Sequence, residues 1–171
     1  MDLDNFKLIN DYYSYDIGNK TIKLIYSLWN ELLSDNEYVG RITADRFAVY
    51  LQYSSEKELI ARLEKFCDMC KNHNNKNLGS YIIVPSIGVY LITEKNVNIQ
   101  QMQNSAVMAK ALVKGDHENM IAVYNSNMRK EMSDRKVLED ELEHAIANKA
   151  FSLVFQPQFK TASKKLSGVE A

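Results

Sequence analysis

Apolar residues recur at steps of three and four along three stretches of the chain, which is the spacing of an amphipathic helix. The pattern predicts a helix from 21 to 33. A second helix begins after Ser55, a good N-cap, and ends at the polar run 71–77. A third extends over 99–113 and stops at Gly115. The apolar stripes of these helices are Ile22, Leu24, Ile25, Leu28, Trp29, Leu32 and Leu33 in the first, Leu59, Ile60, Leu63, Phe66, Cys67 and Cys70 in the second, and Met102, Ala106, Met108, Ala109 and Leu112 in the third.

Short β-prone runs between these helices predict the strands. Residues 38–52 read as a β-hairpin whose turn is the polar tetrad Thr43 to Arg46. Two strand pieces, 81–84 and 87–92, are separated by a proline, and 120–124 is a short last strand. Helices that alternate with strands, with one hairpin among them, predict an α/β (α+β) sandwich with a mixed, partly antiparallel central sheet flanked by helices.

At the start of the chain Asp2 and Asp4 alternate with Leu3, so in a strand both carboxylates face one side. Two carboxylates at a strand end suit a divalent cation. The alternative is a solvated N-terminus with an acidic helix cap. Because the chain opens abruptly on this motif, we expect a domain that is truncated at its N-terminus.

Residues 133–149 have a different pattern, a narrow apolar stripe among many charged residues, which predicts a linker helix. Residues 151–160 alternate with period two, and a further strand begins at Leu166. A hairpin without a packing partner is marginal in water. We therefore expect a first domain at 1–126, a linker helix at 127–149, and the N-terminal fragment of a second domain at 150–171.

The composition agrees with one domain and an appendage, and it narrows the partners. The chain has 171 residues, 46% of them hydrophobic, enough for one good core and too few for two ordinary domains. A net charge of −1, from 21 basic and 22 acidic residues, does not favour a nucleic-acid groove or contact with an anionic membrane. The sequence has neither a signal peptide nor an apolar run of the roughly 20 residues that a membrane helix needs. We therefore expect a cytoplasmic protein.

Two local patterns allow a functional and a structural interpretation. Cys67 and Cys70, with His73 nearby, resemble half of a zinc site, but no second cluster exists, and both cysteines fall on the apolar helix stripe, which favours buried thiols. The tyrosines, among them Tyr12, Tyr13 and Tyr15, would suit a stacking platform for a base. Tyrosines are also common at loops and edges, and without a basic groove that interpretation is favoured.

Five motifs together, in this order and spacing, carry a resemblance to a known family. They are DLDNFKLIND at 2–11, RITADRFAV at 41–49, VPSIGV at 84–89, AK at 109–110, and FQPQF with GVEA within 155–171. The chain resembles a GGDEF domain, joined through a helix to the beginning of an EAL domain, as in cyclic di-GMP signalling proteins. The resemblance implies a nucleotide-cyclase-like palm. The family's signature is Arg-x-Gly-Gly-Asp/Glu-Glu-Phe, and here the last five positions read TADRF.

The resemblance also implies roles for individual residues. Asp2 and Asp45 would bind Mg²⁺, with the backbone of Leu3 as a further contact. Asn10 would read guanine, and Asn19 stands where the family has an aspartate. A neutral amide there loses charge-assisted hydrogen bonds to the base, so guanine selectivity should weaken. The phosphates of GTP would contact the backbone near Phe6 and Lys7 and the side chains of Lys110 and Lys114, the latter in place of an arginine.

The hairpin departs from the family at three positions. Thr43 and Ala44 replace two glycines, whose freedom of backbone angle allows close contact with phosphate. Arg46 replaces an acidic residue that is important for catalysis in the family. The inhibitory Arg-x-x-Asp motif is absent, because residues 34–37 read SDNE. These departures predict that cyclase chemistry is lost while part of the metal and phosphate site remains.

In the C-terminal segment, Gln156 and Glu170 match a substrate-contacting glutamine and the first metal carboxylate of EAL phosphodiesterases. Our first hypothesis is a catalytically inactive GGDEF domain that regulates an attached EAL domain by binding GTP or by forming a homodimer, with the whole protein acting as a cyclic di-GMP phosphodiesterase. The second is a weakly active diguanylate cyclase, which joins two GTP into cyclic di-GMP. The third is a protein-interaction or dimerisation module that binds no nucleotide. No hypothesis includes a nucleic acid or a membrane as a partner.

Overall fold

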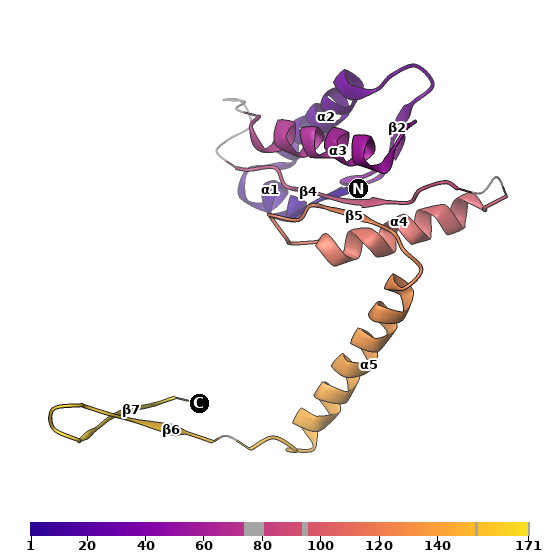
Figure 1. The fold of residues 1–171 in the computed structure, drawn as a ribbon. Coiled ribbons are helices and arrows are strands. Elements are labelled where there is room, and N and C mark those ends of the chain that lie inside the picture. The colour runs from indigo at the N-terminus through magenta and orange to yellow at the C-terminus, as the bar shows by residue number, and fades with distance from the viewer. Residues whose placement is uncertain (74–80, 94–95, 153, 171) are drawn as a thin grey trace. The chain divides into compact units, whose positions relative to one another are not determined.

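Strands and helices alternate along the chain in the computed structural model, which describes residues 1–73, 81–93, 96–152 and 154–170. The chain divides into two compact units, Met1–Met128 and Arg129–Ala171. Figure 1 shows the course of the chain through both.

The sheet of the first unit is mixed. Its central strand β4 (Pro85–Val89) pairs antiparallel with β1 (Asp2–Leu3) and parallel with β5 (Ile121–Val123). Strands β2 (Tyr38–Thr43) and β3 (Arg46–Tyr50) form an antiparallel hairpin. This hairpin continues the sheet beside β1, because the Phe47 N–H donates to the Met1 carbonyl oxygen at 3.0 Å. The predicted mixed, partly antiparallel sheet is confirmed.

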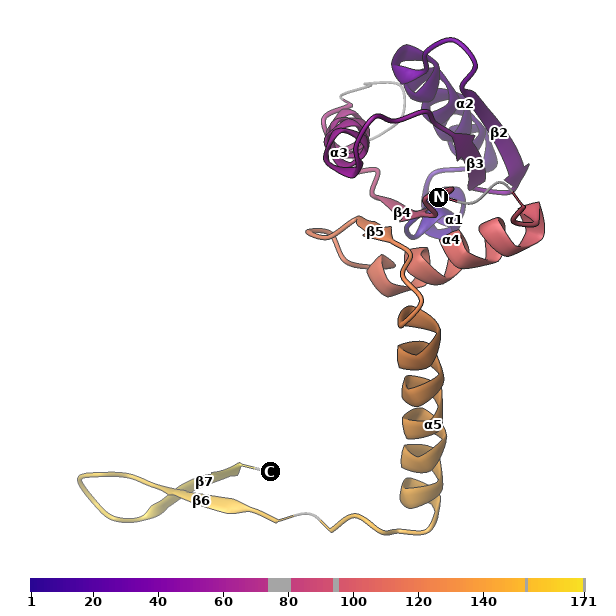
Figure 2. The same cartoon turned by 45° about the vertical axis from the view of Figure 1, so that its right-hand side comes forward.

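Four helices surround this sheet. Helices α2 (Tyr15–Leu32) and α3 (Glu56–Lys71) lie on one side of β4 and β5, and α4 (Ile99–Val113) lies on the other (Figures 1 and 2). The short α1 (Phe6–Tyr12) packs against α2. The main core forms between α2, α3 and the sheet, and its buried residues are Leu3, Ile22, Ile25, Leu28, Trp29, Phe47, Leu59, Leu63, Phe66, Cys67, Cys70, Ile83, Val84, Ile87 and Met120.

Helices α3 and α4 have the predicted positions. At the start of α3 the Ser55 hydroxyl accepts a hydrogen bond from the Glu58 N–H at 3.2 Å, which confirms the predicted cap. Helix α2 begins earlier than predicted, since Ser14 caps it by accepting from the Ile17 N–H at 3.3 Å. The expected strand at 81–84 is not formed, and β4 begins at Pro85.

The start of the chain also differs from the solvated alternative. Asp2 and Asp4 are both buried, and the following residues form α1, which the sequence pattern did not predict. The cap of this helix is Asn5, in a left-handed conformation with φ of 55°, and no acidic side chain caps it. The two aspartates therefore belong to the interior of the sheet.

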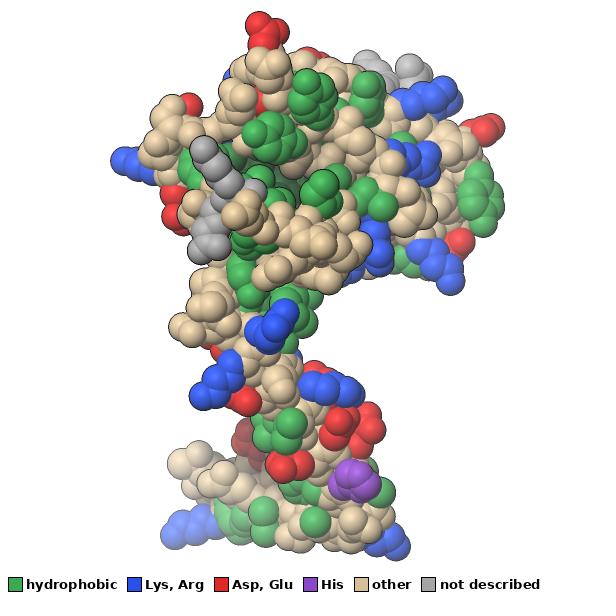
Figure 3. Space-filling model, turned by 90° about the vertical axis from the view of Figure 1, so that its right-hand side faces the viewer, with side chains coloured by type: hydrophobic (Ala, Val, Ile, Leu, Met, Phe, Trp, Pro, Cys, Tyr) green, Lys and Arg blue, Asp and Glu red, His purple; other side chains and the backbone are tan. Residues whose placement is uncertain are grey.

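The second unit begins within α5 (Met128–Ala147), because the buried first residue of this helix, Met128, still belongs to the first unit. Along this helix acidic and basic side chains are interspersed up to Lys136 and acidic ones predominate after it (Figure 3), and apolar residues such as Leu138 and Ile146 are exposed. Strands β6 (Gln156–Phe159) and β7 (Leu166–Glu170) form an antiparallel hairpin. None of the described residues after Met128 is buried. Among the described helices of both units, none combines the length and apolar character that crossing a bilayer requires.

Candidate functional site

The buried aspartate of β1 is the centre of the candidate site. Asp2 is 3% exposed, and its Oδ2 accepts hydrogen bonds from the Nζ of Lys110 and, at 3.0 Å, from the Nζ of Lys114. Burial alone would raise the pKa of Asp2, but the hydrogen bonds and positive charges of the two lysines outweigh burial and hold the pKa below its ordinary value. The carboxylate is therefore ionised at neutral pH.

The other oxygen of this carboxylate is unusual. Asp2 Oδ1 is buried, yet none of the described residues gives it a hydrogen bond. Buried carboxylate oxygens are normally satisfied, so an unpartnered one calls for an explanation such as a missing ligand. It is the kind of atom that a divalent cation would contact.

Helix α4 brings the two lysines to this carboxylate because its backbone sits directly on β4. A Cβ atom added at Gly88 would lie 1.9 Å from the Ala106 carbonyl oxygen and 2.4 Å from the Lys110 nitrogen. Only glycine allows this approach. Lys110 and Lys114 are one helical turn apart, so both reach toward Asp2 from the same face.

The tip of the β2–β3 hairpin contacts β1, the strand that holds Asp2. Asp45 is half-buried, and its Oδ2 accepts a hydrogen bond from the Leu3 N–H at 3.1 Å. Asp45, which is far from Asp2 in sequence, is thus hydrogen-bonded to the residue that follows Asp2 in β1. Thr43 and Arg46 pair with each other at the ends of β2 and β3, and both are exposed.

Ala44 occupies the turn in a conformation that favours glycine. Its φ is +45°, and the Arg41 Nε donates to its carbonyl oxygen at 2.7 Å. A left-handed backbone at a residue with a Cβ costs about 1 kcal/mol or more. The hairpin therefore keeps the backbone shape of a glycine turn although Ala44 carries a Cβ.

The residues expected to read a base lie where α1 meets α2. A Cβ atom added at Gly18 would lie 1.9 Å from the Asn10 Oδ1 and 3.3 Å from the Phe6 ring, so the Asn10 amide packs against the backbone just before Asn19. Asn19 is exposed, and so is Lys7 on α1. Asn10 and Asn19 therefore lie on neighbouring turns of two packed helices.

Asp4 has a structural role instead. Its Oδ1 accepts from the Ser86 hydroxyl at 2.6 Å, and its Oδ2 accepts from the Gly115 N–H at 2.8 Å. Both oxygens are engaged, and the bonds connect β1 to β4 and to the end of α4. Of Asp2 and Asp4, it is Asp2 that has an oxygen without a hydrogen-bond partner among the described residues.

A third buried carboxylate, besides Asp2 and Asp4, was not predicted from the sequence. Glu37, at the last of the positions where the inhibitory motif was sought, accepts hydrogen bonds from Arg62 Nη1 at 2.7 Å, from the Ser34 N–H at 2.7 Å and from the Gln52 N–H at 2.8 Å. The Arg62 guanidinium is the main reason why the pKa of Glu37 falls to about 2. Nothing in the pattern of apolar residues marks these partners, which are 25 residues apart.

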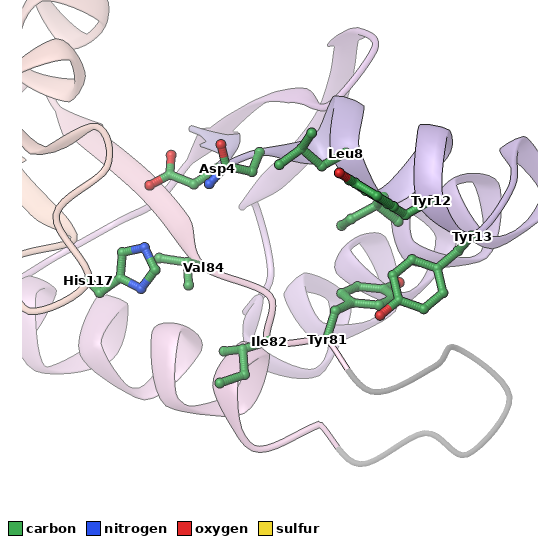
Figure 4. A pocket seen from close by; sticks show the side chains of 10 residues that line it. Asp4, Leu8, Tyr12, Tyr13, Tyr81, Ile82, Val84 and His117 are labelled. Carbon is green, nitrogen blue, oxygen red and sulfur yellow. The ribbon is translucent and has the colours of Figure 1, made fainter.

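A separate cleft of about 550 Å³ opens beside α1 (Figure 4). Tyr13 and Tyr81 face each other there with ring centroids 5.1 Å apart. The lining residues do not include Asp2, Asp45 or Lys110, so this cleft is distinct from the candidate site. Its wall consists of Asp4, Asn5, Leu8, Ile9, Tyr12, Tyr13, Tyr81, Ile82, Val84 and His117.

Other predicted positions lie outside this site. Gln156 lies opposite Glu170 in the β6–β7 hairpin, and both are exposed. Cys67 and Cys70 are buried, and burial raises the pKa of the Cys67 thiol to about 12. Both cysteines therefore behave as small hydrophobic side chains. Within the described residues, no group of three or more His, Cys, Asp or Glu side chains could hold a metal ion by itself.

A mixed sheet with a buried aspartate, a hairpin carboxylate and two helix lysines at one end defines a protein of the nucleotide-cyclase class. Residues 1–120 match the family model described as "Diguanylate cyclase, GGDEF domain", and the chain belongs to this family. Solved structures share the fold. The active GGEEF domain of a diguanylate cyclase from Vibrio cholerae has a TM-score of 0.64 at 22% identity, covering 73% of this chain and 80% of that one. The GGDEF domain of YfiN from Pseudomonas aeruginosa has a TM-score of 0.67 at 19% identity, covering 77% and 78%.

Longer relatives align with nearly the whole chain. The biofilm architecture maintenance protein MbaA of Vibrio cholerae is 26% identical over 99% of this chain and 23% of its own length. The signaling protein YkoW of Bacillus subtilis is 25% identical over 100% and 22%. The cyclic di-GMP phosphodiesterase NbdA of Pseudomonas aeruginosa is 22% identical over 100% and 22%. The chain thus spans less than a quarter of the length of these relatives, and GGDEF domains of this kind occur in cyclic di-GMP signalling proteins.

Proposed function

We propose that this GGDEF domain binds a guanine nucleoside triphosphate with Mg²⁺, makes no cyclic di-GMP, and regulates an attached EAL domain. The observation that carries the proposal is the convergence of Asp2, Asp45, Lys110 and Lys114 at one end of the sheet. Two carboxylates, one with an unpartnered buried oxygen, supply the hard oxygen ligands that Mg²⁺ prefers. Two lysines supply positive charge for phosphates.

The residues present fit a magnesium ion held together with phosphates. Asp2 Oδ1, Asp45 and the Leu3 backbone would contribute protein ligands, and because these are few, phosphate oxygens must complete the coordination. Bound Mg²⁺ neutralises phosphate charge. The side chains of Lys110 and Lys114 would then orient the phosphates, and Asn10 and Asn19 would contact the base.

Loss of catalysis is proposed from the hairpin. Arg46 places a positive charge where the family has an acidic residue, beside the proposed metal carboxylate Asp45. A cation there opposes a second metal ion and offers no carboxylate to the reaction. The Cβ of Ala44 stands in the turn, where glycine would allow phosphates to approach the backbone closely. Cyclic di-GMP formation further needs two such domains facing each other, each with one GTP.

The attached EAL domain is proposed from the end of the chain. The matches to MbaA, YkoW and NbdA extend over 99% to 100% of this chain, beyond the family model that ends at residue 120. NbdA is named a cyclic di-GMP phosphodiesterase. Gln156 and Glu170, opposite each other in β6–β7, would be the first two site residues of that domain.

Calorimetric titration with GTP in the presence of Mg²⁺ tests the binding part. We expect saturable binding that chelation of Mg²⁺ with EDTA removes and that Asp45→Asn weakens. Asp35→Asn is the control, because it removes the same charge from an exposed residue outside the site, and this variant should bind GTP as the parent chain does. Absence of any binding heat would instead favour a nucleotide-free interaction module.

The retained Asp45 contact with Leu3 favours a weak diguanylate cyclase as the second candidate. Incubation with GTP and Mg²⁺ followed by chromatography decides between the two. Sustained formation of cyclic di-GMP that disappears in Asp45→Ala would establish the cyclase and refute the inactive domain. We expect no product from the parent chain at any protein concentration that permits dimers.

A further inference from the structure

The two lysines of the candidate site are held by its own metal carboxylate. Lys110 and Lys114 both bind Asp2 Oδ2, and the Lys110 side chain is only 11% exposed, whereas that of Lys114 is 49% exposed. The second oxygen of Asp2 remains buried and unpartnered among the described residues. In this state the carboxylate expected to bind a cation and the two lysines expected to bind an anion are paired with each other.

These ion pairs disfavour each ligand when it arrives alone. A divalent cation at Asp2 Oδ1 would lie close to two ammonium groups that share the same carboxylate, and like charges repel strongly in a buried site. A triphosphate without a cation would have to draw the lysines away and leave the Asp2 carboxylate buried with no partner. Breaking a buried pair by removing one side is the costly case.

Arrival of both ligands removes this conflict. The lysines move to the phosphates while the cation takes Asp2, so every charge exchanges one partner for another. We propose that the Asp2–Lys110–Lys114 ion pairs close the site to either ligand alone and make a divalent cation and a triphosphate bind only together. This inference deepens the proposed nucleotide site and rests on it.

The cation side is tested with Mn²⁺ alone, without nucleotide, by loss of the free-ion electron paramagnetic resonance signal. The single variant Lys110→Met, and the double variant that carries both Lys110→Met and Lys114→Met, should each bind Mn²⁺ about tenfold more tightly than the parent chain. Tenfold is a typical coupling between two ligands. Addition of Asp2→Asn should abolish the gain, which locates it at Asp2. Lys23→Met, an exposed lysine on α2, is the matched control and should change nothing. Equal Mn²⁺ binding by the parent chain and the lysine variants would overturn the proposal.

The anion side uses inorganic tripolyphosphate in EDTA and the isosteric variant Asp2→Asn, which preserves the shape of the core. Removal of the carboxylate frees both lysines, so tripolyphosphate affinity should rise about tenfold. Asp45→Asn removes the same charge from the carboxylate that binds the Leu3 N–H, and it should raise affinity much less. Unchanged or weaker tripolyphosphate binding by Asp2→Asn would contradict the proposal. Neither arm uses GTP, so failure of GTP binding in the calorimetric test refutes the proposed function separately.

Discussion

At the scale of single residues, the turn of the signature hairpin stores strain. Ala44 has φ of +45°, which glycine adopts freely and alanine does not. Ala44→Gly should therefore raise the free energy of unfolding by about 0.5 to 1 kcal/mol, measured by urea denaturation. The control is Ala48→Gly on the exposed face of β3, where the same change should lower stability by a similar amount. Equal destabilisation by both changes would show that the turn is not strained.

The base-reading pair leads to a prediction about selectivity. Asn19 follows the glycine that contacts Asn10, and an aspartate there would accept charge-assisted hydrogen bonds from the N1 and N2 donors of guanine, which adenine lacks. Asn19→Asp should raise the preference for GTP over ATP about tenfold, the ordinary value of one such discrimination. Competitive titration with the two nucleotides measures it. Asn30→Asp, also exposed on α2, should leave the ratio unchanged.

Short motifs single out Asp2, Asp45 and Lys110 in the sequence, and their roles in metal and phosphate binding stay predictions. The structure joins Lys110 to Asp2 and Asp45 to the Leu3 N–H. Their mutual contacts were not predictable, because the Asp2–Lys110 bond joins residues 108 apart. Glu37 and Arg62 escaped for the same reason, since each is an ordinary charged residue in its local sequence and becomes special only when the fold pairs them.

At the scale of elements, the contact of α4 with β4 depends on one glycine. A Cβ at Gly88 would lie 1.9 Å from the Ala106 carbonyl oxygen, and both sides of this contact are backbone, so neither can yield without moving the helix. Gly88→Ala should lower the free energy of unfolding by about 3 kcal/mol and weaken GTP binding by displacing Lys110. Gly40→Ala in β2, which would meet nothing within 4 Å, is the control and should keep full stability and binding. Thermal unfolding and titration together check both effects.

The ion pair between Glu37 and Arg62 joins the start of β2 to α3 and makes stability depend on pH. The pKa of Glu37 is lowered from 4.5 to about 2, so the folded state gains stability above pH 4.5 and loses it as pH falls toward 2. At about 1.4 kcal/mol for each pH unit, the gain near neutral pH is about 3.5 kcal/mol. Glu37→Gln should lose this amount at pH 7 and show a flatter dependence between pH 5 and pH 2 in denaturant titrations. Glu31→Gln, on an exposed turn of α2, should retain the slope of the parent chain.

The elements themselves were predictable to the extent that their apolar periodicity is long. Helices α3 and α4, each with several apolar turns and a side-chain cap, were located correctly. The seven-residue α1 was not, because it buries only Ile9. The strand predicted at 81–84 does not form, because Ile83 and Val84 are apolar residues that fill the core without pairing as a strand. The Val84 carbonyl oxygen accepts a hydrogen bond from the Asp4 N–H.

At the scale of the whole molecule, the interior is confined to the first unit. Every buried residue among the described ones lies within Met1–Met128, and the second unit consists of an exposed helix and a two-stranded hairpin. Such a hairpin contributes little stability by itself. We therefore predict that a chain ending after Met128 unfolds, in circular dichroism, within about 2 °C of the full chain, since a change of 1 kcal/mol in a domain of this size shifts Tm by about 2 to 8 °C.

Limited proteolysis of the full chain provides the complementary measurement. The first cleavages should fall in the exposed helix and hairpin beyond Arg129 and leave a resistant fragment close to residues 1–128. Cleavage requires local opening, and none of the described residues of the second unit forms a core that would oppose it. The fragment should retain Mg²⁺-dependent GTP binding, since Asp2, Asp45, Lys110 and Lys114 all lie in it. Met128→Ala, which removes the last buried apolar side chain before the second unit, should lower the stability of the fragment and of the full chain equally. A fragment that melts well below the full chain would mean instead that residues 129–171 stabilise the GGDEF domain.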